Sequence, residues 1–293
     1  MVDKPAGMTS HDVVDRIRRA SHMRRIGHTG TLDPAATGLL ILCLGQATRL
    51  SDHFTGLTKI YEGTMRLGIV TDSYDLDGTV VANHVVPELD VAAIQERCRA
   101  LTGDIEQVPP MVSAVKIGGE RLYKKARKGQ TVERLPRPVH VAAFDVLSYH
   151  APDARVRISC SSGTYVRSLC HDVGQALGCG AALASLRRMA VGRHRIENAT
   201  PLDEFTGPES VEQRLLAMGE ALELPVAILE DTARSALANG NPIRNRDLLD
   251  GCPVTSGWLQ LKDEAGTLLA LGLVESTGVE SYVLPKRVFI DER

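Results

Sequence analysis

The chain has 293 residues, of which 43% are hydrophobic and 24% are charged, and its mean hydropathy is −0.07. This composition is ordinary for a soluble globular protein, and it excludes a disordered, collagen-like or membrane-spanning chain. The 34 basic and 36 acidic residues give a net charge of −2, which by itself argues against a nucleic-acid-binding protein.

The apolar pattern predicts helices and strands without a regular strand–helix–strand repeat, and therefore an α+β fold with a largely antiparallel or mixed sheet. Ser10 as N-cap, followed by apolar helical spacing, predicts a helix that ends near His22. An apolar run predicts one buried strand over residues 39–44. The further elements expected are a short helix over 48–54, strands over 59–70 and up to 86, a helix over 90–101, strands over 139–149 and 154–160, a helix over 164–177 and a strand over 183–191.

Two domains are predicted. We expect a larger domain over residues 1–222, which closes with an acidic helical stretch, and a small β-rich domain over residues 225–293. Within the larger domain, residues 107–138 carry prolines at both ends and basic residues between them. This composition predicts a projecting loop or short helix.

Charge is unevenly distributed along the chain. Residues 116–140 contain eight basic and two acidic residues, and residues 155–195 contain seven and one, whereas residues 197–232 contain one and nine. The basic segments are able to converge on one face and attract a polyanion. They are also compatible with solvated faces of unrelated elements.

Common metal and cofactor motifs are missing from the sequence. The six cysteines form no C-x-x-C pair, and the chain does not open with a signal-type segment, so we expect reduced, mostly buried thiols and a cytoplasmic protein. Neither a phosphate loop nor a G-x-S-x-G elbow occurs. The acidic turn with Asp72, Asp75 and Asp77 resembles a calcium loop, but Ser73 and His84 stand where Asp and Glu are needed. We therefore expect no metal and no cofactor.

Glycines and a proline surround Asp33 in the segment GHTGTLDPAATG, residues 27–38. Pro34 disfavours the α region for Asp33, and the glycines permit tight turns, so this segment is able to present Asp33 on a rigid loop. The competing interpretation makes Asp33 a helix N-cap with Pro34 at the first helical position. His28 alone is also compatible with an ordinary surface histidine.

A second candidate motif is SSGTYVR, residues 161–167, which is predicted to be a strand end, a glycine turn and a helix start. Arg167, one turn into this helix, is able to project over the sheet and pair with a carboxylate. A solvated helix charge is the competing interpretation.

Six motifs follow one another in the chain: DKPAGMTS (3–10), GHTGTLDP (27–34), KIY (59–61), PPMVSAVK (109–116), SGTYVR (162–167) and LRR (186–188). In sequence and in order they resemble the TruB family of tRNA pseudouridine synthases. The resemblance covers about residues 3–205, and the region beyond residue 225 weakly resembles the family's small PUA-like RNA-binding domain. Only Met1 and Val2 precede the first motif, where the family usually has a few more apolar residues of a first strand.

This resemblance implies a pseudouridine synthase catalytic domain and an isomerase that converts uridine 55 in the T-loop of tRNA to pseudouridine. It implies that Asp33 is the nucleophile, attacking the ribose or the base, and that Arg167 stabilises the ionised carboxylate. Tyr61 is expected to stack on the base and to help remove its C5 proton. The expected partner is the T-arm of tRNA. We expect a monomer that needs no cofactor, no metal and no membrane.

The target base must be flipped out of the folded T-loop. By resemblance, His28 takes the space that the base leaves, and Tyr165 and Leu186 line the uracil pocket with Tyr61. The RNA backbone is expected to contact basic residues of the insertion, namely Lys116, Arg121, Lys124, Lys125, Arg127 and Lys128.

Two other functions stay open on the sequence. A non-catalytic tRNA-binding protein or folding chaperone on the same scaffold would keep the basic insertion but could lose Asp33, Tyr61 or Arg167, all of which are present. An unrelated acid–base hydrolase using Asp33 with Asp72 or Asp75 would leave the basic segments unexplained.

Overall fold

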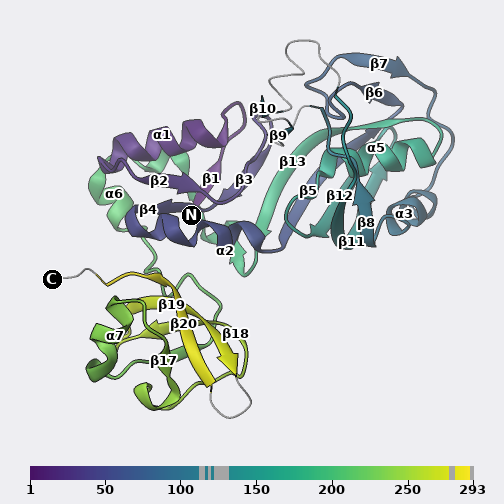
Figure 1. Cartoon of the computed structure of the whole chain (residues 1–293). Coiled ribbons are helices and arrows are strands. Elements are labelled where there is room, and N and C mark those ends of the chain that lie inside the picture. Colours follow the sequence, from purple (N-terminus) through teal and green to yellow (C-terminus); the bar gives the residue numbers. More distant parts are fainter. Residues whose placement is uncertain (112–115, 118–119, 122–131, 277–280, 291–293) are drawn as a thin grey trace. The chain divides into compact units, whose positions relative to one another are not determined.

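The computed structural model describes residues 1–111, 116–117, 120–121, 132–276 and 281–290 (Figure 1). These residues belong to two compact units. The first consists of Met1–Leu44 and Leu50–Val211, and the second of Gly45–Arg49 and Glu212–Arg293.

The first unit is built on a mixed nine-stranded sheet with the order β15-β1-β3-β13-β5-β12-β11-β8, and β14 pairs with β13. Most neighbours are antiparallel, whereas β1 runs parallel to β15 and β13 runs parallel to β3. The sheet confirms the predicted α+β fold. Its strands are β1 (Val2–Lys4), β3 (Thr37–Leu40), β5 (Lys59–Leu67), β8 (Gly103–Gln107), β11 (Arg137–His150), β12 (Asp153–Cys160), β13 (Ala181–Val191), β14 (His194–Arg195) and β15 (Thr200–Pro201).

Two helices pack on this sheet, α3 (Val91–Arg99) against β11 near one edge and α5 (Val166–Ala176) against β13 (Figure 1). Fully buried side chains from the two helices, such as Ile94 and Leu169, join Met65, Val156 and Ile158 of the strands in one apolar cluster. Because every methylene removed from water favours folding, this cluster fixes α5 on the sheet and thereby places the side chains at its N-terminal end.

Helix α1 (Ser10–Ser21) packs its apolar face in a second cluster with Val2 and Leu40. The predicted N-cap is wrong by one residue, because Thr9 caps the helix and accepts a hydrogen bond from the backbone of Asp12. The Ser10 hydroxyl instead accepts a hydrogen bond from the backbone N–H of Leu32, 2.8 Å away. Ser10 is thus used to hold the loop that carries Asp33.

Two predicted strands are each divided in the structure. The predicted strand over 39–44 is wrong as a single element, because the Ile41 carbonyl accepts a hydrogen bond from Thr29 and the chain changes partners there. The strand after Ile41, β4 (Leu42–Leu44), pairs with β2 (Ile26–His28). Gly68, at a φ of +84°, separates β5 from β6 (Ile69–Thr71).

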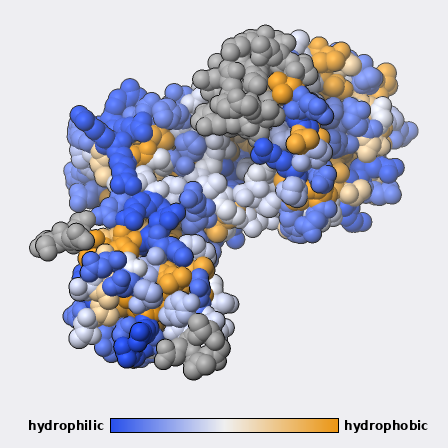
Figure 2. Space-filling model, viewed as in Figure 1, coloured by the Kyte–Doolittle hydropathy of each residue, from blue (hydrophilic) through white to orange (hydrophobic). Residues whose placement is uncertain are grey.

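Strand β6 and strand β7 (Val80–Asn83) form a hairpin that exposes Val80 and Val81, and apolar side chains gather in this part of the surface (Figure 2). The hairpin contributes little to the core, but its connecting turn over residues 72–79 lies against β13, since the Leu183 N–H donates to the Tyr74 carbonyl at 2.9 Å. The insertion after Gln107 contains the two-stranded pair β9 (Lys116–Ile117) and β10 (Glu120–Arg121).

The second unit contains a five-stranded sheet with the order β16-β18-β19-β20-β17, and so the predicted β-rich character of this region is confirmed. Its core includes Leu237 of α7 (Arg234–Ala238) and Leu259 and Val283 of the sheet. The strands are β16 (Val226–Ile228), β17 (Ile243–Arg244), β18 (Gly257–Lys262), β19 (Leu268–Ser276) and β20 (Ser281–Val288).

The predicted acidic helical stretch up to residue 222 is largely wrong. A single short helix, α6 (Pro208–Glu212), begins at the proline that follows Gly207, because proline is tolerated only in the first turn of a helix. Among the described residues, the remaining helical elements are α2 (Ser51–Gly56) and the 3₁₀ helices η1 (Gly45–Leu50), η2 (Ile196–Asn198), η3 (Leu202–Glu204), η4 (Asp231–Ala233) and η5 (Asn245–Asp247).

Candidate active site

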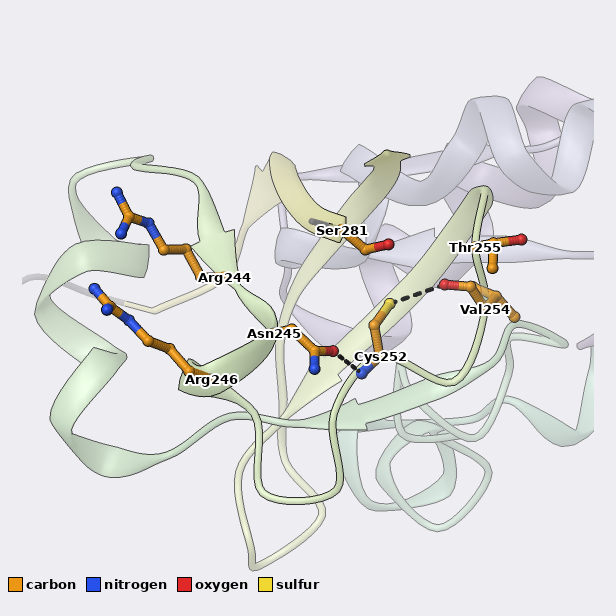
Figure 3. Close-up of a pocket in the computed structure, with 7 residues that line it drawn as sticks. All are labelled: Arg244, Asn245, Arg246, Cys252, Val254, Thr255 and Ser281. Atoms are coloured by element: carbon orange, nitrogen blue, oxygen red, sulfur yellow. Dashed lines mark hydrogen bonds between the residues drawn. The ribbon is translucent and has the colours of Figure 1, made fainter. Parts of the chain in front are cut away.

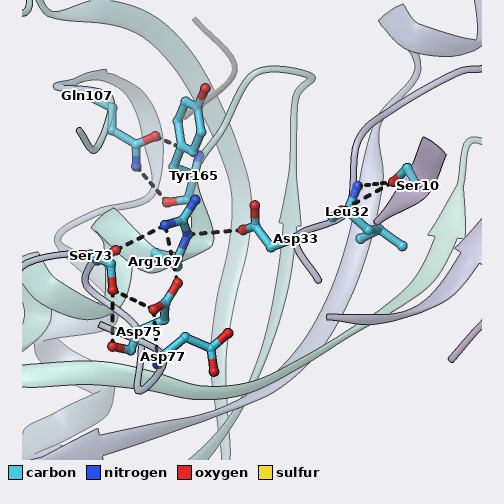
Figure 4. Close-up of polar contacts among 9 residues, drawn as sticks. All are labelled: Ser10, Leu32, Asp33, Ser73, Asp75, Asp77, Gln107, Tyr165 and Arg167. Atoms are coloured by element: carbon cyan, nitrogen blue, oxygen red, sulfur yellow. Dashed lines mark hydrogen bonds and ion pairs between the residues drawn. The ribbon is translucent and has the colours of Figure 1, made fainter. Parts of the chain in front are cut away.

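The loop that carries Asp33 is fastened on both sides of that residue. Before it, Leu32 is buried and exchanges two hydrogen bonds with the Ser10 hydroxyl, at 2.8 and 3.2 Å (Figure 4). After it, the ammonium group of the buried Lys4 donates to the carbonyls of Pro34 and Ala36 at 3.1 and 2.6 Å. No helix begins at Asp33 in this described loop, so the N-cap interpretation is wrong.

Asp33 pairs with Arg167, whose side chain extends from the first turn of α5. The Nε atom of Arg167 lies 3.1 Å from Oδ2 of Asp33, and its Nη1 atom lies 3.2 Å from Oδ2 of Asp75. Nη1 also donates to the Ser73 carbonyl at 3.1 Å. Asp33 and Asp75 approach the guanidinium from different sides (Figure 4). Arg167 is therefore a buried link between two carboxylates, and the alternative of a solvated helix charge is wrong.

The environment of the ion pair is uneven. The Arg167 side chain is 4% exposed, whereas the Asp33 side chain keeps 45% of its surface exposed and is able to meet a ligand from solvent. Partial burial raises the pKa of Asp33 above its usual value, and Arg167 and Lys4 oppose this rise, while Asp75 adds to it. The buried position of Lys4 lowers the pKa of its ammonium group to about 8.

Asp75 is a site residue to which sequence reasoning gave no role in this pair. It lies in the tight turn between β6 and β7, where its Oδ1 accepts hydrogen bonds from the Ser73 hydroxyl at 2.5 Å and from the Asp77 N–H at 3.2 Å. The acidic turn was visible in the sequence, but its partner lies 92 positions away in α5. The sequence signal that could have found Asp75 is the acidic turn itself, read together with Arg167. A guanidinium carries five N–H donors and is able to pair with a second carboxylate besides Asp33.

Tyr61 lies on β5, opposite Ile158 of β12 and Arg188 of β13. Burial raises the pKa of its hydroxyl, and the positive charge of Arg188, together with a hydrogen bond from that residue, partly offsets the rise. The Arg188 side chain is buried and also donates to the carbonyls of Leu39 and Gly30, at 2.7 and 3.1 Å. A Cβ atom on Gly38 would collide with the Arg188 backbone, which explains the glycine at that position.

The other predicted pocket residues occupy three different elements. Tyr165 precedes α5, where its backbone N–H and carbonyl are both bound by the buried amide of Gln107, at 2.7 and 3.0 Å (Figure 4). Leu186 is half-buried on β13, opposite Gly63 of β5. His28 is half-buried at the end of β2. Their assignment to a uracil pocket stays a prediction.

The predicted RNA-backbone residues lie in the insertion. Lys116 and Arg121 are opposite each other in the β9–β10 pair. The remaining four, Lys124, Lys125, Arg127 and Lys128, lie outside the described residues.

In the described ranges, no group of three His, Cys, Asp or Glu residues is arranged to hold a metal ion, and no helix has the length and apolarity needed to cross a membrane. All six cysteines are free, and five are buried.

The second unit carries a cavity of about 490 Å³, in which the Cys252 N–H donates to the Asn245 amide (Figure 3). Arg244, Asn245, Arg246, Cys252, Val254, Thr255 and Ser281 line this cavity.

Comparison with known families places the site in context. Residues 18–166 match the model of the TruB family pseudouridylate synthase (N terminal domain), and residues 167–223 match that of the tRNA pseudouridylate synthase B C-terminal domain. The chain is 49% identical over 224 residues to tRNA pseudouridine synthase B of Opitutus terrae, covering 75% of this chain and 92% of the relative. The protein of the same name from Thermobifida fusca is 45% identical over 251 residues, covering 83% of this chain and 85% of the relative.

Among solved structures, the fold is similar to a chain in the crystal structure of the archaeal box H/ACA sRNP Nop10–Cbf5 complex. The TM-score is 0.74 at 24% identity, and the match covers 99% of this chain and 85% of that chain. The two family models together cover both the loop that carries Asp33 and the helix that carries Arg167. The chain therefore belongs to the TruB family of tRNA pseudouridine synthases, which are isomerases.

Proposed function

We propose that this protein converts uridine 55 in the T-loop of tRNA to pseudouridine, with Asp33 as the nucleophile. The observation that carries the proposal is the pairing of a half-exposed carboxylate, on a loop fastened from both sides, with a buried guanidinium 3.1 Å away. Such an arrangement keeps a carboxylate ionised and aimed while leaving it open to a substrate.

The reaction exchanges one glycosidic bond for another without a change of oxidation state. The ionised Asp33 attacks either C1′ of the ribose or the uracil ring, and the bond between N1 and C1′ breaks. The base turns, and a bond forms between C5 and C1′. The bond to Asp33 breaks as C5 displaces the carboxylate from C1′, or, after attack on the ring, when the carboxylate leaves the ring again. C5 loses its proton, N1 carries a proton in the product, and Asp33 is regenerated as an anion. Atoms and electrons balance within the nucleotide and water, so the step requires no cofactor.

Arg167 has two tasks in this proposal. Its positive charge opposes the rise in the pKa of Asp33 that burial causes, so that the nucleophile is available as an anion. Its contacts with Asp75 and with the Ser73 carbonyl hold the guanidinium plane, so that Nε faces Asp33 rather than solvent.

Tyr61 stacks on the target base in this proposal, and its hydroxyl helps to take the proton from C5. A tyrosine hydroxyl is protonated at neutral pH, and burial raises its pKa further. It is therefore able to accept the C5 proton only while it releases its own, and stacking is the larger of its two contributions.

The base reaches the site only after it leaves the T-loop stack, at a cost of a few kcal/mol. His28 fills the vacated space, Tyr165 and Leu186 contact the uracil, and the basic insertion contacts the RNA backbone. Since these backbone contacts are electrostatic, tRNA affinity is expected to fall as salt concentration rises.

The position is tested with tRNA transcripts that carry a C5-tritiated uridine at position 55. We expect release of one tritium atom per tRNA from the full transcript and from an isolated T-arm hairpin. A transcript with all uridines tritiated but cytidine at position 55 is the matched control and should release none. Release from the cytidine-55 transcript, or none from the uridine-55 transcript, would contradict the proposed position.

A further inference from the structure

A stacked aromatic pair lies beside the Arg167–Asp75 ion pair. The rings of Tyr74 and His171 are almost parallel, with an interplanar angle of 19° and centroids 4.0 Å apart. Tyr74 directly precedes Asp75 in the turn between β6 and β7, and His171 follows Arg167 by four residues in α5. Residues four apart lie on the same face of a helix. The stack therefore joins the same two elements as the ion pair, one helical turn further along.

The turn adopts an unfavourable backbone conformation at the residue that makes this stack. Tyr74 has a φ of +66°, in the left-handed region that residues with a Cβ atom rarely occupy. Such conformations persist where the surroundings over-determine them, and they cluster at functional sites. A tyrosine in place of the usual glycine or asparagine indicates that its ring is needed there.

The backbone on both sides of Asp75 is held by β13. The Leu183 N–H donates to the Tyr74 carbonyl at 2.9 Å, and the Leu76 N–H donates to the Leu183 carbonyl at 3.0 Å. These two bonds fix the turn beside β13, in a parallel bridge between Asp75 and Leu183. The bonds from β13 do not reach α5. Three other contacts join the turn to that helix: the Asp75–Arg167 ion pair, the hydrogen bond from Arg167 to the Ser73 carbonyl, and the Tyr74–His171 stack.

His171 is suited to stacking rather than to charge. Its Nδ1 atom is buried and has no hydrogen-bond partner in the described part of the chain. Desolvation lowers the pKa of the ring, which favours the neutral imidazole. A neutral ring packs on tyrosine without adding a second positive charge beside Arg167.

We propose that Tyr74 and His171 are positioning residues, whose stack sets the spacing between the 72–79 turn and α5 and so holds Asp75 against Arg167. The inference rests on the proposed function in that Arg167 must be oriented toward a reacting Asp33. Neither ring touches the reacting atoms in this account. Both act through Asp75 and the guanidinium that it holds.

Paired variants separate the ring from the backbone. Tyr74→Asn accepts the left-handed conformation but removes the ring, and Tyr74→Phe retains the ring. His171→Ala and His171→Phe make the same comparison on α5. We expect Tyr74→Asn and His171→Ala to lower the single-turnover rate constant about tenfold, near the upper end of what an aromatic pair contributes. The Phe variants should stay within about twofold of the unsubstituted protein, and all four should bind tRNA with unchanged Kd.

A double-variant cycle with Asp75→Asn tests the route of the effect. If the stack acts through Asp75, Tyr74→Asn lowers the rate about tenfold in the unsubstituted protein and hardly at all in the Asp75→Asn protein. An equal loss in both backgrounds, or no loss in either, would overturn the proposal in favour of a general structural role.

A readout without turnover keeps this inference apart from the proposed function. In ¹⁵N-labelled protein without RNA, the Nε–Hε resonance of Arg167 reports its pairing directly. We expect it to shift in Tyr74→Asn and His171→Ala and to stay in place in both Phe variants. An unmoved resonance in the Asn and Ala variants would overturn the positioning role. Turnover retained by Asp33→Asn would instead contradict the proposed function and leave this measurement valid.

Discussion

Two arginines of the described chain are buried, Arg167 and Arg188, and their partners differ in kind. Arg167 faces the carboxylates of Asp33 and Asp75. Arg188 instead donates to the carbonyl oxygens of Leu39 and Gly30 and to the Tyr61 hydroxyl. In the proposed mechanism Arg167 acts on the charge of the reacting carboxylate, whereas the carbonyl contacts of Arg188 determine where the backbone lies.

The two regions meet at the same loop. Gly30 and Leu39, whose carbonyls Arg188 binds, lie on either side of Asp33 in the sequence, and Lys4 binds two further carbonyls of that loop. Arg188 and Lys4 therefore position the loop, and Arg167 acts on the carboxylate that the loop presents. Two buried guanidinium groups thus differ in use according to their partners: carbonyls at Arg188 and carboxylates at Arg167.

The largest effect in this comparison is expected from Arg167→Lys. A single ammonium group cannot reach Asp33, Asp75 and the Ser73 carbonyl together. We expect the single-turnover rate constant to fall by about 10²–10³, as for the loss of one preorganised donor in other active sites. Arg155→Lys, at an exposed arginine beside Glu62, is the matched control and should leave the rate unchanged. A loss below fivefold in Arg167→Lys would place Arg167 outside the chemistry.

The corresponding substitution at Arg188 should lower the free energy of unfolding. Arg188→Lys removes at least one hydrogen bond to a buried carbonyl, which costs about 1–3 kcal/mol of unfolding free energy. Urea denaturation measures this loss. Arg187→Lys, at the neighbouring, partly exposed arginine that pairs with Asp3, serves as control and should cost less than about 1 kcal/mol. If Arg188→Lys were as stable as the control, Arg188 would have no architectural role.

A smaller effect concerns pH. The pKa of Asp33 is raised, chiefly by burial, so its carboxylate becomes protonated at a higher pH than an ordinary aspartate. The rate should therefore fall on acidification through this raised pKa. The effect of Asp33 on folding stability has the opposite sign to its effect on rate. A carboxyl whose pKa is raised in the folded state favours folding most at low pH. This contribution is lost as the pH rises through the folded-state pKa. Asp33→Asn should consequently have a slightly higher Tm than the unsubstituted protein at pH 7. A lower Tm would show that the ion pair with Arg167 outweighs desolvation.

Much of the fold could be predicted because its signals are local. The spacing of Val13, Val14 and Ile17 is enough to define α1, and strand alternation defines β11 and β12 within a few residues. The division of residues 39–44 into β3 and β4 could not be predicted, because it depends on the hydrogen bond from Thr29 to the Ile41 carbonyl. The acidic composition near residue 222 likewise suggested a helix where proline and glycine allow only short turns.

The candidate site, like the fold, has one part that local sequence signals predict and another that depends on contacts between distant segments. Asp33 and Arg167 were both found from motifs with unusual glycine and proline content, and the structure brings them together at 3.1 Å. Asp75 and the Tyr74–His171 stack could not be assigned, because each depends on two segments about a hundred residues apart in sequence that β13 and α5 bring together. Local patterns thus identified the pair that we propose to react, and long-range packing determined the groups that hold it.

The most direct test of the account is the single-turnover rate of tritium release from position 55 by Asp33→Asn, measured beside Asp77→Asn. Asp77 lies in the acidic turn and is exposed, so it matches the loss of one carboxylate without touching Arg167. The account predicts no detectable release by Asp33→Asn, with tRNA affinity within a few-fold of the unsubstituted protein, and nearly full activity of Asp77→Asn. Retained release by Asp33→Asn would contradict the central claim that this carboxylate is the nucleophile.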